Sequence, residues 1–356
     1  MKAHRNLIYI ALHIYFVLII LIKSVLVPSI AALAVSVFQG CSKQACSQDG
    51  DFTEKPQRIS VKSAVHYFSD APVKCIDALV YNDDVMQRID CYQRFDKTEN
   101  ETLLIGSCSG PKIIFLCANS QWTKDDWRES DSFNKLKRVK AELERESRQH
   151  PLMTAETYAE AGDILTDIRF TRLSSTIELR SISCDFSGKP YDGERITEAK
   201  AYLININGSC SIIPQDSYDI ERIINHGELI SEDLKSFRDS SLIINYLGTI
   251  GPETLYPKTE LICYPNTCDW EGAESQYTRL VIEGKISGET WYWPIDINRG
   301  SGNPHEGIER NMKYTYDITI HRKGTKDPNH PILQETAEVD FTAEKWTEQE
   351  NYHIAF

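Results

Sequence analysis

The chain has 356 residues, of which 52 are acidic and 39 basic, so its formal net charge is −13 at neutral pH. This charge argues against nucleic-acid binding, because phosphate neutralisation needs clustered Lys and Arg. Hydrophobic residues make up 41% and charged residues 26%, which excludes a disordered tail and supplies enough apolar side chains for two folded domains.

The first forty residues predict an export signal. One uncharged apolar run extends from Asn6 to Ile22, and a second follows Lys23 and ends in FQGC at Cys41. The second run has the basic residue, apolar core and small residues of a secretory signal, so we predict a signal peptide over residues 1–40 and lipidation of Cys41. The first run is then an over-extended gene start or an uncleaved anchor. The alternative is one long membrane helix in which Cys41 is an ordinary residue.

Nine further cysteines have irregular spacing and include no CxxC pair, so we expect no zinc site. Cys75 and Cys117 lie in apolar runs and are expected to be buried thiols. Cys263 and Cys268 flank the turn sequence YPNT and are a candidate disulfide in an exported protein.

The first half of the mature chain predicts a tether followed by short strands. Residues 41–57 are polar, as expected of a flexible, lipidated tether. Apolar and alternating runs predict strands at 58–68, at 74–83 and, as a pair, within 101–121. Between 127 and 149, Leu136, Val139 and Leu143 recur at helical spacing among mixed charges, which predicts one surface helix.

The second half continues the pattern of short strands. We predict strands within 171–186, 198–214, 258–266, 277–286, 289–298, 307–325 and 335–356. The stretch 307–325 has strict period two, the pattern of a half-buried strand. Residues 215–255 are predicted to be a long insertion with a short helix near 231–237. The pattern favours a mainly β protein of two β-sandwich domains, over residues 58–168 and 169–356.

The sequence contains no motif of a known catalytic site. It lacks HExxH, GxSxG, a Walker loop and a GxGxxG after a strand. The pairs Asp83-Asp84 and Asp125-Asp126 could supply a general acid and base to a glycosidase. They stand in turns or at helix starts, however, where Asp is favoured for backbone reasons. We therefore predict no enzyme activity, no cofactor and no metal site.

Trp291 and Trp293 suggest an alternative function. If exposed, they could stack on sugar rings in a surface-anchored glycan-binding lipoprotein. Alternation places both on one face of the strand predicted at 289–298, and such a face is more often part of a core.

Several stretches, in order along the chain, resemble the fimbrillins, the structural subunits of type V pili on Gram-negative surfaces. They are CIDALVYND (75–83), KIIFLCANS (112–120), PLMTAE (151–156), TRLSSTIEL (171–179), TRLVIEGKI with WYWPIDIN (278–298) and GIERNMKYTYDITIHRKGTKDPNHPI (307–332). The set spans most of residues 58–356, and the last stretch is the most specific.

The resemblance implies two transthyretin-like β-sandwiches in tandem, export as a lipoprotein to the outer membrane, and a homo- or hetero-polymer of fimbrial subunits that supports adhesion. It also implies donor-strand exchange, in which a protease removes the first strand and a neighbour's strand replaces it. Tyr352, Ile354 and Phe356 alternate on one face and could fill that groove, or could form the last strand of their own sandwich. Glu309, Arg310 and Asn311 are expected to fix the turn before the strand in 307–325.

The interval between the first two strands departs from the family pattern. Stalk subunits of the family are cut there after an Arg, whereas residues 69–75 (SDAPVKC) contain no Arg and Lys74 is their only basic residue. Either a protease of other specificity cuts at Lys74, or the subunit keeps its first strand, as would suit an anchor or accessory subunit.

Overall fold

The computed structural model describes residues 60–96, 102–218, 220–268, 271–272, 276–299, 306–330, 332 and 336–345. Strands dominate these residues and the helices are short, which confirms the prediction of a mainly β fold. Within these ranges, no helix has the length and apolar character needed to cross a membrane.

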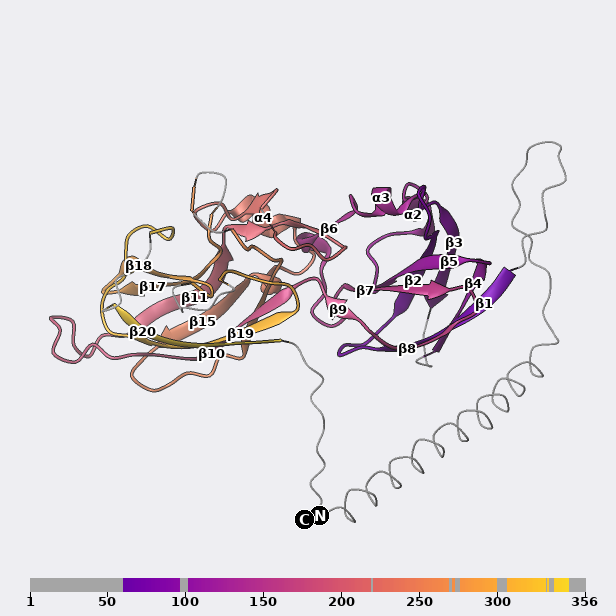
Figure 1. Cartoon of the computed structure of the whole chain (residues 1–356). Coiled ribbons are helices and arrows are strands. Elements are labelled where there is room, and N and C mark those ends of the chain that lie inside the picture. Colours follow the sequence, from indigo (N-terminus) through magenta and orange to yellow (C-terminus); the bar gives the residue numbers. More distant parts are fainter. Residues whose placement is uncertain are drawn as a thin grey trace, which may run out of the picture. The chain divides into compact units, whose positions relative to one another are not determined.

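A three-stranded and a five-stranded sheet form the first sandwich (Figure 1). Their strand orders are β4-β1-β8 and β3-β2-β5-β7-β9. The strands are β1 (Ser60–Phe68), β2 (Cys75–Asn82), β3 (Ile89–Asp96), β4 (Thr102–Cys108), β5 (Pro111–Ala118), β7 (Met153–Glu160), β8 (Ile164–Arg169) and β9 (Thr171–Arg172). Facing side chains from both sheets, such as Val65 of β1 and Leu116 of β5, form one apolar core.

The segment that we predicted as one surface helix over residues 127–149 has a different structure. It forms α2 (Lys124–Trp127), α3 (Phe133–Leu136), β6 (Lys140–Glu142) and the 3₁₀ helix η1 (Leu143–Arg145). Trp127, Phe133 and Leu136 are buried and pack in one cluster with Phe115 of β5. The prediction was wrong because the helical spacing comes from successive short turns, α2, α3 and η1, that bury Trp127, Phe133, Leu136 and Leu143. In addition, residues 140–142 pair with another strand.

The second sandwich consists of two four-stranded sheets, with the orders β16-β10-β19-β20 and β15-β11-β17-β18. The strands are β10 (Ser175–Cys184), β11 (Ile196–Ile204), β15 (Ile244–Ile250), β16 (Thr259–Cys263), β17 (Arg279–Ile286), β18 (Glu289–Asp296), β19 (Met312–Ile320) and β20 (Ala337–Lys345). Leu179, Leu203, Ile282 and Tyr316 are among the buried side chains that fill the space between the two sheets.

The strand predicted within 307–325 is β19, and it lies inside its sheet. It pairs in parallel with β10 and antiparallel with β20. Tyr314, Tyr316, Ile318 and Ile320 are buried, as the period-two pattern predicts. The backbone N–H of Glu309 donates to the Tyr314 hydroxyl at 3.1 Å, so the turn before β19 is fixed to the core.

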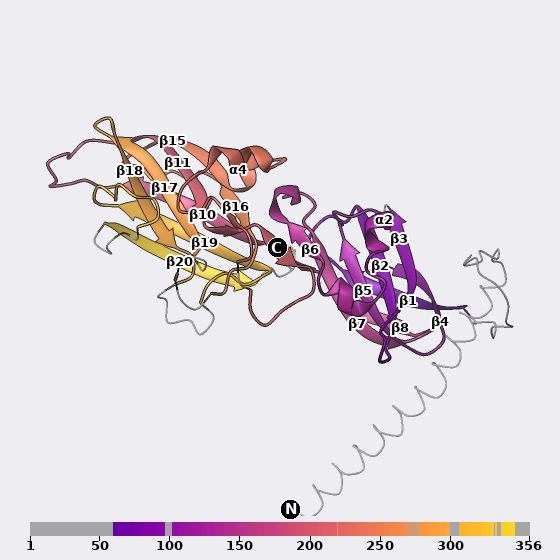
Figure 2. The same cartoon turned by 90° about the horizontal axis from the view of Figure 1, so that it is seen from above.

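Residues 215–255 are more regular than we predicted. They contain β14 (Ile223–Ile224), α4 (Ser231–Ser236), the 3₁₀ helix η2 (Ser240–Leu242) and the edge strand β15. Figure 2 shows α4 close to β15 and β11, and its Leu234 packs against Tyr202 and Ile244. Only the short helix was predicted here. The strands β12 (Ile206–Asn207) and β13 (Ser209–Ser211) pair with β14 and β6 respectively.

Candidate functional site

The first strand holds the three-stranded sheet together. β1 pairs antiparallel with β4 from Ser60↔Cys108 to His66↔Thr102, and in parallel with β8 from Ala64↔Ile164 to Phe68↔Arg169. In this sheet β4 and β8 are joined only through β1. Removal of β1 would therefore leave unpaired backbone groups on two strands at once.

β1 also contributes to the core. Alternate residues point inward, and Ser63, Val65 and Tyr67 are only 2%, 0% and 4% exposed. The Tyr67 ring packs edge to face on Phe170, with ring centroids 5.4 Å apart. Without β1, the apolar core of the first sandwich would lose Val65 and Tyr67, and an apolar groove would open between β4 and β8.

Hydrogen bonds hold the link between β1 and β2. Asn119, which directly follows β5, has a positive φ of 56° and turns its amide towards the link. Its Oδ1 accepts the backbone N–H of Lys74 at 2.8 Å, and its Nδ2 donates to the Pro72 carbonyl at 3.0 Å. The Lys74 side chain is exposed, but its backbone is therefore fixed. Burial raises the pKa of the next residue's thiol, Cys75.

An ion pair holds the other end of the link. Asp70 Oδ2 lies 3.0 Å from Arg172 Nε, and both side chains are only 13% exposed. The Ser69 hydroxyl donates to the Ala71 carbonyl at 2.7 Å and to Met153 Sδ at 3.4 Å. The interval that we predicted as a processing site is thus anchored at Ser69, Asp70, Pro72 and Lys74.

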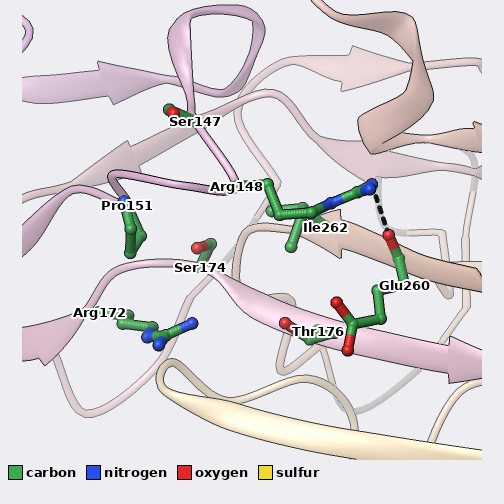
Figure 3. A pocket seen from close by; sticks show the side chains of 8 residues that line it. All are labelled: Ser147, Arg148, Pro151, Arg172, Ser174, Thr176, Glu260 and Ile262. Carbon is green, nitrogen blue, oxygen red and sulfur yellow. Dashed lines mark hydrogen bonds between the residues drawn. The ribbon is translucent and has the colours of Figure 1, made fainter. Parts of the chain in front are cut away.

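A cavity of about 190 Å³ lies beside Arg172 (Figure 3). Its lining comes from the segment before β7, from β9, β10 and the turn between them, and from β16: Ser147, Arg148, Pro151, Arg172, Ser174, Thr176, Glu260 and Ile262. Arg148 crosses it and donates to the Glu260 carbonyl at 2.7 Å.

The other predicted site residues fall into two groups. Cys41, Tyr352, Ile354 and Phe356 lie outside the described residues, so lipidation and a polymerisation strand stay predictions. Cys263 is a fully buried free thiol, so the disulfide that we predicted between Cys263 and Cys268 is not formed in the structure. Cys75 and Cys117 are buried thiols, as expected. Among the described residues, no group of three or more His, Cys, Asp or Glu is arranged to hold a metal ion.

The aromatic pair of the alternative hypothesis does not form an open platform. Trp293 is fully buried, and its Nε1 donates to the Arg322 carbonyl at 2.9 Å. Trp291 is partly buried, with Lys326 Nζ 3.6 Å from its ring centroid and Lys323 Nζ at 5.2 Å. The ring face that a sugar would need is thus covered by a lysine.

One residue of each acidic pair bonds to the backbone of a turn or a helix start. Asp126 and Thr123 form a reciprocal capping box at the start of α2. Asp84 Oδ1 accepts the backbone N–H groups of Met86 and Gln87 in the β2–β3 turn. Both arrangements agree with the turn and capping interpretation of these residues.

The sequence did not predict that Asn119 and Arg172 hold the link, nor that Arg310, which was expected only to fix a turn, bonds to Arg172. Asn119, Arg172 and, one step away, Arg310 each make contacts with residues distant in the chain. The sequence did carry a signal for Asn119, Arg172 and Arg310, because these residues lie in the stretches CANS, TRLSS and IERN that carry the family resemblance.

These features define a class: two tandem β-sandwiches in which the first strand is central to its sheet and followed by an anchored link. Solved structures with this fold include a protein from Bacteroides eggerthii DSM 20697 that is proposed to act in cell adhesion, with a TM-score of 0.63 and 14% identity over 81% of this chain and 96% of that chain. A fimbrilin from Porphyromonas gingivalis W83 has a TM-score of 0.59 and 13% identity over 80% of this chain and 97% of its own.

A third similar structure is the tip fimbrial protein Mfa3 of Porphyromonas gingivalis with a C-terminal truncation, with a TM-score of 0.51 and 12% identity over 81% of this chain and 100% of that chain. The resemblance inferred from the sequence motifs is thus confirmed at the level of the fold. A search against models of protein families gave no match, and no curated protein matches in sequence.

Proposed function

We propose that this protein is a non-enzymatic structural subunit of a surface fimbria, exported as a lipoprotein through Cys41 and assembled by donor-strand exchange. In this proposal β1 is removed by cleavage after Lys74. A strand of a neighbouring subunit, carrying Tyr352, Ile354 and Phe356, then takes its place between β4 and β8.

The observation that supports this proposal most strongly is the position of β1. It is the central strand of its sheet, it pairs with both neighbours, and it places Val65 and Tyr67 in the core. A replacement strand must therefore supply backbone pairing on two sides and apolar side chains at every second position. The alternating residues Tyr352, Ile354 and Phe356 meet the second requirement.

A peptide-capture experiment tests the exchange step. The full chain is cleaved after Lys74 and incubated with a labelled peptide of residues 346–356. We expect stable capture by the cleaved chain and none by the uncleaved chain. The matched control is the same peptide with Ile354→Asp, because a carboxylate in the groove would be buried without a partner. Equal capture of both peptides, or of neither, would refute exchange through this strand.

The glycan-binding alternative has no comparable support. Its sequence basis was the pair Trp291 and Trp293, and the structure buries one ring and covers the other. A glycan pull-down that is abolished by Trp291→Ala, in a protein that still folds, would restore this alternative.

A further inference from the structure

Four of the stretches that carry the family resemblance meet at one place in the structure. Asn119 comes from CANS, Met153 and Thr154 from PLMTAE, Arg172 from TRLSSTIEL and Arg310 from IERN. Asn119, Met153 and Arg172 contact the β1–β2 link directly. Arg310 does not contact the link, but its Nε donates to the backbone carbonyl of Arg172. These stretches therefore share a three-dimensional arrangement that sequence order does not reveal.

Arg310, in the turn before β19, reaches into the first sandwich. Its Nε donates to the Arg172 carbonyl at 3.2 Å. One terminal nitrogen donates to Thr154 Oγ1 at 3.0 Å and to the Thr171 carbonyl and hydroxyl at 3.3 Å each. A single guanidinium of the second sandwich thus joins β7 and β9 of the first.

Asn311 adds a second bond to the same strand. Its Oδ1 accepts the backbone N–H of Arg172 at 3.2 Å, and its own N–H donates to the Ser174 carbonyl at 3.3 Å. Asn311 has a positive φ of 60°, a conformation that Asn tolerates better than most residues. Both main-chain polar groups of Arg172 are therefore bonded to side chains of the β19 turn.

Arg172 carries this connection onward. Its backbone is held by Arg310 and Asn311, while its side chain holds Asp70 in the link. Arg172 therefore connects the second sandwich directly to the processing interval: its backbone is bonded to the β19 turn and its side chain to Asp70. Displacement of the β19 turn would remove both hydrogen bonds on the Arg172 backbone and leave the β9 backbone held by its short pairing with β7.

We infer that the turn of Glu309, Arg310 and Asn311 is a latch that keeps the β1–β2 link resistant to cleavage while the second sandwich is docked. This inference rests on the proposed function, since it concerns the cut after Lys74, and it adds a control by the second sandwich. A protease needs several residues of extended, detached substrate backbone. The anchored link supplies this only when it opens, so the cleavage rate follows the population of the open form. The β1–β2 link is therefore protected from cleavage only after the second sandwich has folded and docked.

Native-state proteolysis tests the latch. The full chain is treated in detergent with an endopeptidase that cuts after Lys, and the new terminus at Cys75 is followed by mass spectrometry. We expect Asp70→Asn to speed this cleavage at least about tenfold, because it weakens the direct anchor of the link. We expect Arg310→Ala to do the same, although Arg310 touches no residue of the link. Lys74→Gln must abolish the product.

The matched control is Arg180→Ala. Arg180 pairs with Asp317 on the exposed face of the second sandwich, remote from the link in the hydrogen-bond network, and its loss should change the cleavage rate less than about twofold. Asn311→Gly covers the case in which Arg310→Ala fails to fold, since glycine accepts the positive φ and only the side-chain bond to Arg172 is lost. Urea denaturation of each variant separates local opening from global unfolding.

An increase for Asp70→Asn but not for Arg310→Ala or Asn311→Gly would show that the link is anchored locally and would overturn the latch. No increase for Asp70→Asn would overturn it as well. If the cleavage rate rises at all lysine sites in parallel, the increase follows global instability, and this result would also overturn the latch. Because cleavage is measured without assembly, a cleaved chain that fails to capture the donor peptide would contradict strand exchange and leave the latch intact.

Discussion

Tyr67→Ala is the substitution that best separates the two states of the first sandwich. In the uncleaved chain the Tyr67 ring is buried and meets Phe170 at an interplanar angle of 79°. Truncation of a buried aromatic ring to Ala costs about 3–5 kcal/mol, of which about 0.5–1.5 kcal/mol belongs to the ring pair. We therefore expect the free energy of unfolding of the uncleaved chain to fall by about 3–5 kcal/mol.

After strand exchange Tyr67 is no longer part of the sandwich, so the same substitution should leave assembled subunits unchanged. Urea denaturation of the uncleaved chain, and dissociation of assembled fibres in denaturant, measure the two states. The control is His66→Ala on the same strand. Its ring points outward and shares only an exposed hydrogen bond with Thr102, so it should cost less than about 1 kcal/mol. Equal destabilisation of uncleaved chain and fibre by Tyr67→Ala would refute the replacement of β1.

Three further predictions concern the stability of the uncleaved chain, each measured by urea denaturation. Asp77 is fully buried and accepts from Trp127, Tyr92 and Arg94, so Asp77→Ala should cost about 3–5 kcal/mol, whereas Asp96→Ala, which removes the exposed partner of the same Arg94, should cost less than about 1 kcal/mol. Burial raises the pKa of Glu146, so the folded state binds its proton more tightly and the free energy of unfolding falls as pH rises from 4.5 through the folded pKa. Glu146→Gln should flatten this dependence on pH. An unchanged slope would contradict the assignment of the pH dependence to Glu146. The hydrogen bond from Arg180 lowers the pKa of Asp317, so the contribution of this carboxylate to stability is present above pH 3.8 and is lost as pH falls through the folded pKa. Asp317→Asn should lower the free energy of unfolding by less than about 1 kcal/mol, and a larger loss would contradict this prediction.

The strands that the sequence predicted best are those with one buried and one polar face. β19 and β20 alternate strictly, and the inward residues of β20 include Val339 and Phe341. β3 was missed because its residues are half-buried or exposed on both faces, so that no period-two contrast marks it. β15 was missed for a similar reason, with Tyr246 76% exposed and a glycine at position 248.

The candidate site was only partly predictable. The interval with Lys74 could be predicted from its place between two strands. The anchors of this interval could not, because Asp70 and Arg172 are 102 residues apart and Arg172 and Arg310 are 138 apart. Glu309, Arg310 and Asn311 were predicted only to fix a local turn. They do so through Tyr314 and Ser174, and Arg310 also crosses to Thr154 of the other sandwich.

The most direct test of strand exchange is the N-terminal sequence of this protein in fimbriae sheared from cells, compared with the protein in whole membranes. We expect a terminus at Cys75 in the sheared fraction, because β1 must leave before a neighbour's strand can enter. A lipid-modified Cys41 at the terminus of every copy, in the sheared fraction and in membranes alike, would contradict strand exchange.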